Sequence, residues 1–476
     1  MASKTYDLIV IGSGPAGEKG AAQAAYFGKR VALIEKEPVL GGAAANTGTL
    51  PSKTLRETAL YLSGFLQREL FGVNISMKEK VTVRDFLFRE RVVKENERER
   101  VVENLKRHNV ELYMGTASFV DAHTVSIHPT RSSEVQIQGE VILIATGSYP
   151  HHPPIFPFHD ARIYDSDSIL TMHDIPSTMV IAGGGAIGCE YACMFAALGI
   201  DVSLVEARER LMSFLDVEIS HTLRERMEAM GIHMIMPDSV ETVEAGAENI
   251  EVRLQSGSVL NTHTILVASG RCSNTEGLAL EKIGLTTNKR GQIEVNENYQ
   301  TRVPTVYAVG DVIGFPALAS TSMEQARVAM VHAFDLKYKT HLASVLPYGI
   351  FTIPEVSMAG ETEETLKEKK IPYIAGKALY SGNARGEIVG DNSGFLKLLF
   401  REEDMKLLGV HIIGEQATEI VHVGLSALLL GAGADLFIQT CYNYPTLSEM
   451  YKYATYDALG TRALTQGRKG AMPPGE

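Results

Sequence analysis

Two stretches of this chain share one organisation: DLIVIGSGPAGEKGAAQAAYFGKRVALIE at residues 7–35 and TMVIAGGGAIGCEYACMFAALGIDVSLVE at residues 178–206. Each is an apolar strand, a G-x-G-x-x-G turn, a helix, and a second apolar strand that ends in glutamate. In dinucleotide-binding units the glycines permit a tight turn beside a pyrophosphate, the helix N-terminus supplies amide donors, and the acid accepts from a ribose hydroxyl. Both acids, Glu35 and Glu206, lie eighteen positions beyond the last glycine. This matched spacing predicts that one chain holds two dinucleotides.

The composition is that of an ordinary globular protein. The 476 residues are 45% hydrophobic and 21% charged, and the formal net charge is −12. This charge argues against nucleic acid and anionic membranes as partners, and no apolar run approaches the length of a membrane span. Four cysteines without a C-x-x-C pair favour a reducing compartment, and Asp7 interrupts anything like a secretory apolar core. We therefore expect a cytoplasmic protein.

Several polar segments are expected to have structural roles, and we expect no metal site. Residues 83–107 combine many charges with spaced apolar residues, as in an amphipathic helix that is exposed on most sides. The stretch HHPPIFPF at 151–158 is typical of a crossover between domains, because prolines suit extended connections. No acid or further histidine at ligand spacing accompanies its histidines, so a solvated linker is favoured over a metal site. Cys189 and Cys193 lie one helical turn apart, and a role as small buried hydrophobes is favoured over a metal or redox pair.

Four further motifs give the chain a specific resemblance. They are GGAAANTGTLPSK at 41–53, ATG at 145–147, AVGD at 308–311 and YPTLSE at 444–449. Together with the two glycine-rich units, their order resembles the flavoprotein disulfide reductase family over essentially the whole chain. The resemblance implies an α/β fold with two Rossmann-like dinucleotide-binding domains, for FAD and NAD(P), and a C-terminal α+β dimerisation domain.

The resemblance also implies domain boundaries and a homodimer. We expect an FAD-binding domain in two segments, an inserted NAD(P)-binding domain, a dimerisation domain without a nucleotide signature, and a disordered tail. The expected bounds are 1–150 and 275–346 for the FAD domain, 151–274 for the NAD(P) domain, 347–466 for the dimerisation domain and 467–476 for the tail.

The departures from the family pattern concern its thiol chemistry. The family's redox disulfide occupies positions that here hold Ala44 and Thr49, so a dithiol relay from flavin to substrate is impossible. Disulfide-reducing members have a His-x-His-Pro-Thr motif, whose second histidine is replaced here by Tyr444, while Glu449 keeps the acid position. The soluble Si-specific pyridine nucleotide transhydrogenase branch resembles this chain in its Gly-Thr and Asn-Tyr-Pro-Thr segments. That branch usually retains the first cysteine, which is Ala44 here.

The resemblance assigns site residues to this sequence. Lys53 is expected beside flavin N5, paired with Glu190, where a cation stabilises negative charge on the flavin. The expected catalytic set is Lys53, Glu190, Tyr444 and Glu449. The expected FAD contacts are Gly12, Gly14, Gly17, Glu35, Lys53, Ala117, Thr146, Gly147, Asp311 and Ala319. The expected nicotinamide nucleotide contacts are Gly183, Gly185, Gly188, Glu206, Val240 and Gly270.

The choice between NAD and NADP stays open in the sequence. The carboxylate of Glu206 favours the ribose diol of NAD(H) and repels the 2′-phosphate of NADP(H). Arg208 and Arg210 follow closely and can pair with such a phosphate, although a solvated surface position is favoured for both. NAD is therefore the safer assignment, and NADP(H) remains an alternative.

Three functions are compatible with these residues. The first is hydride exchange between NADPH and NAD+ through bound FAD. The second is an NADH diaphorase that reduces a quinone, which the same site permits. The third is a non-catalytic FAD-bound scaffold derived from a dihydrolipoamide dehydrogenase-like ancestor, which the survival of Lys53 and Glu190 disfavours. We favour the first, because an isoalloxazine can accept hydride from one nicotinamide and return it to another without a disulfide.

Overall fold

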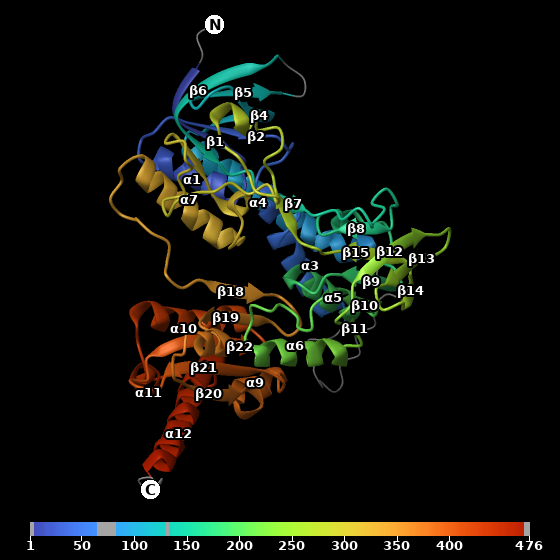
Figure 1. Cartoon of the computed structure of the whole chain (residues 1–476), viewed down its shortest axis with the longest axis vertical. Coiled ribbons are helices and arrows are strands. Elements are labelled where there is room, and N and C mark those ends of the chain that lie inside the picture. The colour runs from blue at the N-terminus through green and yellow to red at the C-terminus, as the bar shows by residue number, and fades with distance from the viewer. Residues whose placement is uncertain (1–3, 64–81, 130–132, 471–476) are drawn as a thin grey trace.

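The computed structural model describes residues 4–63, 82–129 and 133–470, and it consists of three bodies, each built on one larger sheet with its helices (Figure 1). Two smaller sheets, of three and two strands, accompany the three larger ones. The first sheet lies at the N-terminal end of the elongated molecule and the third lies at the C-terminal end, with the second between them on one side (Figure 1). As predicted, the architecture is α/β. Within the described part of the chain, no helix is long and apolar enough to cross a membrane.

The first sheet has the order β3-β2-β1-β6-β5-β4, and β17 also pairs with β6. Its centre is parallel, and Leu8, Ile9 and Val10 in β1 are all fully buried because both faces are covered. Helices α1, α4 and α7 cover one face, while β4, β5 and the segment 278–293 cover the other. Helices α1 and α7 pack together on this sheet. The strands and helices of this part are β1 (Lys4–Ile11), α1 (Pro15–Tyr26), β2 (Val31–Glu35), α2 (Gly42–Asn46), α3 (Thr49–Leu62), α4 (Val83–Arg107), β3 (Glu111–Met114), β4 (Thr116–Phe119), β5 (Thr124–His128), β6 (Val135–Ile144), β17 (Val306–Ala308) and α7 (Ala319–Ala333).

The second sheet repeats the parallel arrangement with the order β11-β10-β9-β15-β8, beside a three-stranded antiparallel sheet. The chain leaves the first body through β7 and returns through β16, and these two strands pair with each other. The predicted crossover at 151–158 directly follows β7. The elements are β7 (Ser148–Pro150), β8 (Ile163–Asp165), β9 (Thr178–Ala182), α5 (Ala186–Ala197), β10 (Asp201–Val205), α6 (Val217–Ala229), β11 (His233–Ile235), β12 (Val240–Ala245), β13 (Ile250–Leu254), β14 (Val259–Thr262), β15 (Thr264–Val267) and β16 (Arg271–Ser273).

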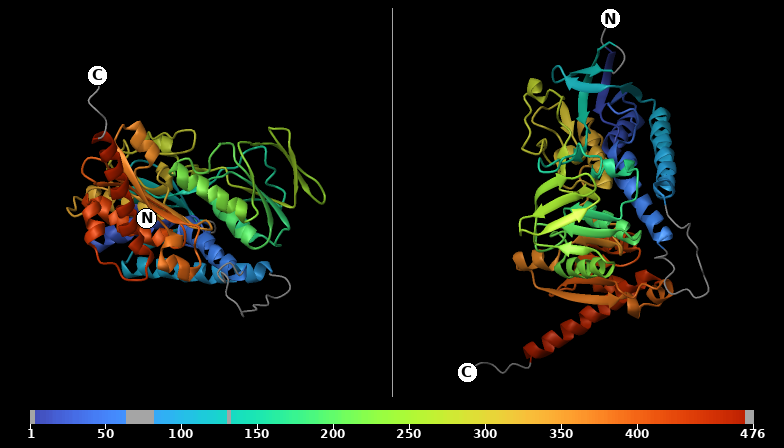
Figure 2. Two further views of the ribbon diagram at one scale, coloured as in Figure 1. Left: turned by 90° about the horizontal axis from the view of Figure 1, so that it is seen from below. Right: turned by 90° about the vertical axis from the view of Figure 1, so that its right-hand side faces the viewer.

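The third body is an antiparallel sheet of order β18-β19-β22-β21-β20 packed against helices, as predicted for an α+β unit. Helix α12 runs outward from it (Figure 2) and continues through Gly470, into the segment where we predicted a tail. Residues 471–476 of that predicted tail lie outside the described residues. The elements are β18 (Pro347–Ile350), β19 (Val356–Gly360), α8 (Glu363–Glu368), β20 (Tyr373–Leu379), α9 (Ala384–Val389), β21 (Phe395–Arg401), β22 (Leu407–Ile413), α10 (Ala417–Leu430), α11 (Ala434–Gln439) and α12 (Met450–Gly470).

Two of the predictions about polar segments are confirmed. Helix α4 spans 83–107, and a capping box between Thr82 and Asp85 satisfies amides at its start. Cys189 and Cys193 are fully buried in the core that α5 shares with α3 and the third body. Burial raises the pKa of Cys193 to about 12 and that of Cys189 well above its usual value, so both are neutral structural thiols.

A buried ionic junction joins α6 of the second body to the third sheet. The ammonium of Lys397, in β21, lies 2.9 Å from Asp216 Oδ1 and 3.2 Å from Glu218 Oε2, and it also pairs with Glu363. Lys397 and Asp216 are almost completely buried. The three carboxylates are close enough together to hold a metal ion, but the ammonium of Lys397 already pairs with all three. We therefore interpret this cluster as a structural joint.

Candidate functional site

Both predicted glycine-rich turns adopt the same strained geometry. Gly12 and Gly183 have φ of +104° and +118°, and a Cβ on either would lie 2.4 or 2.5 Å from a carbonyl oxygen of the neighbouring strand-end segment. A Cβ on Gly17 or Gly188 would lie 1.8 or 1.9 Å from the carbonyl oxygen of the first glycine in its own turn. These four positions therefore require glycine for the fold itself.

The middle glycine of each turn has a different reason to be glycine. A Cβ on Gly185 would meet no atom within 4 Å, and a Cβ on Gly14 would meet only Gly42 Cα at 3.8 Å. Each of these glycines is the N-cap of a long helix, and neither helix receives a side-chain cap. Each turn thus leaves space beside a helix N-terminus that has no side-chain cap, which fits a pyrophosphate.

The two acids at the strand ends also repeat one geometry. Glu35 Oε2 accepts from the amide of Ser13 at 2.9 Å and from its hydroxyl at 2.6 Å. Glu206 Oε2 accepts from the amide of Gly184 at 2.6 Å, and its Oε1 accepts from the amide of Arg208 at 2.9 Å. Each acid is therefore held against the second residue of its own glycine turn, where a ribose beside the pyrophosphate would meet it.

Lys53 and Glu190 form the predicted pair, although 137 positions separate them in sequence. The distance from Lys53 Nζ to Glu190 Oε2 is 2.6 Å, and the lysine side chain is 27% exposed while that of the glutamate is 8% exposed. Glu190 Oε1 accepts from the backbone amide of Phe351 at 2.9 Å. The Phe351 ring lies against the same ammonium, 4.9 Å from Nζ to the ring centroid. Three distant segments thus converge on one charge.

The segment expected to carry the redox thiols lies over the first glycine turn. A Cβ on Gly42 would come within 2.7 Å of Gly14 Cα, so the start of α2 touches the turn itself. Ala44 lies in α2 and Thr49 begins α3, the helix that carries Lys53. Neither residue can form a thiolate, so this position offers no sulfur to accept electrons.

A hydrogen-bond chain at the ends of β6 and β17 includes residues that the sequence reasoning missed. Asp311 Oδ2 accepts from the hydroxyl of Ser148 at 2.7 Å, and Arg271 Nε donates to the same Ser148 oxygen at 2.8 Å. Arg271 also pairs with Asp167 at 3.1 Å. The sequence contains a signal for Arg271, because ILVASGR at 265–271 repeats the pattern of ILIATGS at 142–148.

Thr146 and Gly147 are held by a second missed residue, Asn274. The hydroxyl of Thr146 donates to the Asn274 carbonyl at 2.6 Å, and the Asn274 amide donates to the Gly147 carbonyl at 2.9 Å. Asn274 directly follows β16, so the returning strand fixes the loop that left the first body. The remaining predicted contacts lie at element ends or in strands: Ala117 in β4, Val240 at the start of β12, Gly270 before β16 and Ala319 at the start of α7.

Tyr444 and Glu449 lie apart from this convergence within one chain. They belong to the segment between α11 and α12, at the end of the molecule opposite the first sheet (Figure 1). The side chain of Tyr444 is 74% exposed. Glu449 accepts from the Tyr453 hydroxyl at 3.4 Å. A role at the flavin therefore requires a second subunit.

The two arginines that follow Glu206 differ in their surroundings. Arg210 donates to the Ser213 carbonyl at 2.7 Å and lies 3.7 Å from Glu364 of the third body. Arg208 is exposed, and among the described residues its guanidinium makes no hydrogen bond or ion pair. Arg210 is therefore part of the contact between bodies, while Arg208 is available to a ligand.

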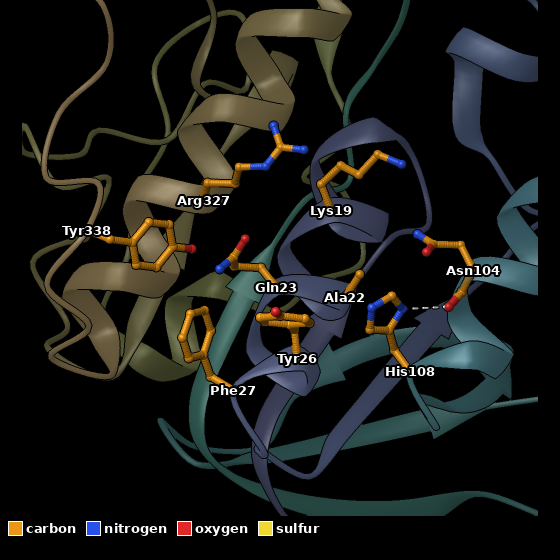
Figure 3. Close-up of a pocket in the computed structure, with 9 residues that line it drawn as sticks. All are labelled: Lys19, Ala22, Gln23, Tyr26, Phe27, Asn104, His108, Arg327 and Tyr338. Atoms are coloured by element: carbon orange, nitrogen blue, oxygen red, sulfur yellow. Dashed lines mark hydrogen bonds between the residues drawn. The ribbon is translucent and has the colours of Figure 1, made fainter.

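A separate hollow of about 580 Å³ opens on the outer face of α1 (Figure 3). Tyr26, Phe27 and Tyr338 gather on one side of it, and Lys19 and Arg327 reach toward it from above (Figure 3). Each of these cations already pairs with a glutamate neighbour in the chain. None of the predicted site residues lines this hollow, so it is distinct from the converging site.

Comparison with known proteins agrees with the fold and the order of motifs. Residues 6–333 match the family described as pyridine nucleotide-disulphide oxidoreductase, and residues 346–455 match its dimerisation domain. A protein named soluble pyridine nucleotide transhydrogenase from Mycobacterium bovis is 43% identical over 98% of this chain and 100% of its own length. One of the same name from Chromohalobacter salexigens is 40% identical over 96% and 99%.

Solved structures show the same architecture. The HOCl-induced flavoprotein disulfide reductase RclA from Escherichia coli superposes with a TM-score of 0.85 at 26% identity, covering 95% of this chain and 99% of that one. LpdA from Mycobacterium tuberculosis reaches 0.87 at 22% identity over 95% and 99%, which shows a common fold. The family implies FAD and nicotinamide nucleotides as cofactors. The chain therefore belongs to the pyridine nucleotide-disulphide oxidoreductase family.

Proposed function

We propose that this chain is an FAD-dependent oxidoreductase that exchanges hydride between nicotinamide nucleotides, NADPH + NAD+ giving NADP+ + NADH. The observation that carries the proposal is the combination at α2 and α3: the Lys53–Glu190 pair is in place, while Ala44 and Thr49 leave no thiol to receive electrons. The names of the relatives at 40–43% identity describe the same reaction.

The residues present fit FAD on the first body. The open space beside Gly14 and the uncapped N-terminus of α1 suit a pyrophosphate, and Glu35 suits a ribose hydroxyl. Asp311, three residues after β17, suits the ribityl hydroxyls. Bound there, FAD supplies an isoalloxazine that takes hydride from one nicotinamide and gives it to another. The ammonium of Lys53 adds fixed positive charge that favours electron uptake, and Glu190 limits the cost of burying that charge.

The residues of the second body fit a nicotinamide nucleotide in the same way. Gly185 and the uncapped start of α5 suit its pyrophosphate, and Glu206 suits the ribose diol of NAD(H). Use of NADP(H) then depends on Arg208, whose free guanidinium can pair with a 2′-phosphate beside that carboxylate. Arg210 does not contribute, because it is held by Ser213 and Glu364.

We further propose the assembly and organisation that the family resemblance implies. The FAD domain comprises 1–150 and 275–346, the NAD(P) domain 151–274 and the dimerisation domain 347–466. In a cytoplasmic homodimer, the segment that holds Tyr444 and Glu449 in one subunit would cover the flavin of the other. The exposure of Tyr444 in the single chain supports this arrangement. Light scattering on the purified protein tests it, since a monomer would contradict it.

The experiment that tests the function is an anaerobic spectral titration. The yellow protein is expected to lose its 450 nm-region colour with NADPH or NADH and to regain it when an oxidised nicotinamide analogue is added. Return of colour with a quinone but with no nicotinamide would instead favour the diaphorase. Persistent colour with both reduced nucleotides would favour the non-catalytic scaffold. A protein that binds no flavin would contradict the proposal altogether.

A further inference from the structure

The segment Phe351–Thr352, directly after β18, contacts the Lys53 site from the third body. The Phe351 amide donates to Glu190 Oε1 at 2.9 Å, and the Phe351 ring lies 4.9 Å from Lys53 Nζ. The next carbonyl, that of Thr352, accepts from Arg56 Nε at 3.0 Å. These two consecutive residues therefore contact three side chains, those of Lys53, Arg56 and Glu190. No sequence motif predicted a role for Phe351 or Thr352.

Arg56 ties the helix of Lys53 to the same segment. It lies three positions after Lys53 in α3, so both side chains project from one face of the helix. The Arg56 side chain is 8% exposed and also lies 3.4 Å from Glu355, four residues after Phe351. These contacts fix the distance between α3 and the third body. They leave the Lys53 side chain little freedom beyond its position between Glu190 and the ring.

The ring and the carboxylate act on the ammonium in different ways. Glu190 attracts the ammonium as its ion-pair partner. The electron-rich face of Phe351 also attracts the ammonium, and the ring excludes water from that side. A charge with less water around it acts more strongly on nearby groups, because the local dielectric constant is lower. The effect of Lys53 on a neighbouring flavin therefore depends on Phe351.

We propose that Phe351 is a positioning residue for Lys53, and that its ring keeps the ammonium in the place where negative charge develops on the flavin. This proposal rests on the proposed function, which puts the isoalloxazine beside Lys53. We therefore expect the midpoint potential of the bound flavin to be higher with the aromatic ring than without it. The backbone amide of Phe351 remains after any substitution, so a side-chain change isolates the ring.

The test is the midpoint potential of the flavin in the holoprotein, measured by equilibration with a reference dye. Phe351→Leu is expected to lower the equilibrium constant for holding the ammonium in this place by about 2- to 30-fold, because a cation–π contact contributes that range. That range corresponds to a potential lower by about 10 to 40 mV for two electrons. Phe351→Tyr, which keeps the ring face, is expected to retain the wild-type potential.

The chain offers a matched control in Lys29 and Phe334. Their contact has nearly the same geometry, 4.7 Å from Nζ to the ring centroid, and lies at the far end of α7 from its Ala319 terminus. Phe334→Leu is expected to leave the potential unchanged. An equal fall in both leucine variants would mean a general loss of packing, and it would overturn the proposal.

A second substitution separates the attraction of the ring for the cation from the packing of the side chain. Trifluorinated phenylalanine at position 351 keeps the shape of the ring but weakens its attraction for cations, and it is expected to lower the potential in the same direction. A wild-type potential in this variant and in Phe351→Leu would refute the role of Phe351. Because dye equilibration uses no nicotinamide, this outcome is independent of whether the wild-type protein regains colour with an oxidised nucleotide.

Discussion

The buried junction at Lys397 allows a quantitative prediction about stability. Lys397→Met removes an ammonium that lies 2.9 Å from Asp216 and 3.2 Å from Glu218 and that also pairs with Glu363. The carboxylate oxygens lie within 4.8 Å of one another, so they would repel each other without the lysine. Loss of one partner from a buried pair typically costs about 3–5 kcal/mol of the free energy of unfolding. We expect a loss in this range at pH 7.

The pH dependence of the same variant gives a second, independent check. Burial alone would raise the pKa of Glu363, but hydrogen bonds from Lys397, Tyr373 and Lys367, together with the charge of Lys397, outweigh burial and lower the pKa from 4.5 to about 2. The stabilisation is therefore complete above pH 4.5 and disappears as the pH falls toward 2. The shift corresponds to up to about 3 kcal/mol. The difference between wild type and Lys397→Met should consequently narrow between pH 4.5 and 2.

The assay is urea-induced unfolding at several pH values, followed by circular dichroism. Lys369→Met is the control, because Lys369 makes a 2.5 Å pair with Glu361 at the surface, and it should change stability by less than about 1 kcal/mol. Adding Asp216→Asn to Lys397→Met should recover part of the loss, since one unpaired charge is removed. Two results would contradict the stabilising role of Lys397. One is a loss of unfolding free energy at pH 7 no larger than that of Lys369→Met, and the other is a difference between wild type and Lys397→Met that is constant with pH.

Three further predictions concern the nucleotide sites. Lys53→Ala should slow flavin reduction by NADH roughly 100-fold while FAD stays bound, which stopped-flow absorbance would measure; unchanged kinetics would remove Lys53 from the mechanism. Glu206→Ala should raise the ratio of kcat/KM for NADPH to that for NADH about tenfold, because a repelling carboxylate is lost. If the ratio does not move, this acid does not read the ribose. Arg208→Ala should lower kcat/KM for NADPH about tenfold and spare NADH, whereas Arg210→Ala should change both equally; the reverse pattern would contradict the assignment of the two arginines.

Local sequence patterns predicted the fold well because their physical causes are local. The glycine turns, the apolar strands and the helix at 83–107 each depend on residues within one short stretch. The requirement for glycine at Gly17 arises from the carbonyl of Gly12, five positions earlier, so spacing alone reveals it. Helix α12 continues through Gly470, into the segment 467–476 for which we predicted a tail.

The converging site could be predicted only in part. We predicted the pairing of Lys53 with Glu190 from family resemblance, because 137 positions separate the two residues and no local pattern links them. Phe351 and Asn274 were missed because the sequence does not show which distant residues their backbone groups and the Phe351 ring meet. The burial of Lys397 has no local signal in the sequence, because it depends on the packing of α6 against the third sheet.

The most direct test of hydride exchange is single-turnover reoxidation in an anaerobic stopped-flow instrument. The holoprotein is first reduced with one equivalent of NADPH and then mixed with an oxidised nicotinamide analogue whose reduced form absorbs at a distinct wavelength. We expect flavin colour to return at the same rate as the reduced analogue appears, in equal amounts. Flavin that stays reduced in the presence of excess analogue would contradict it.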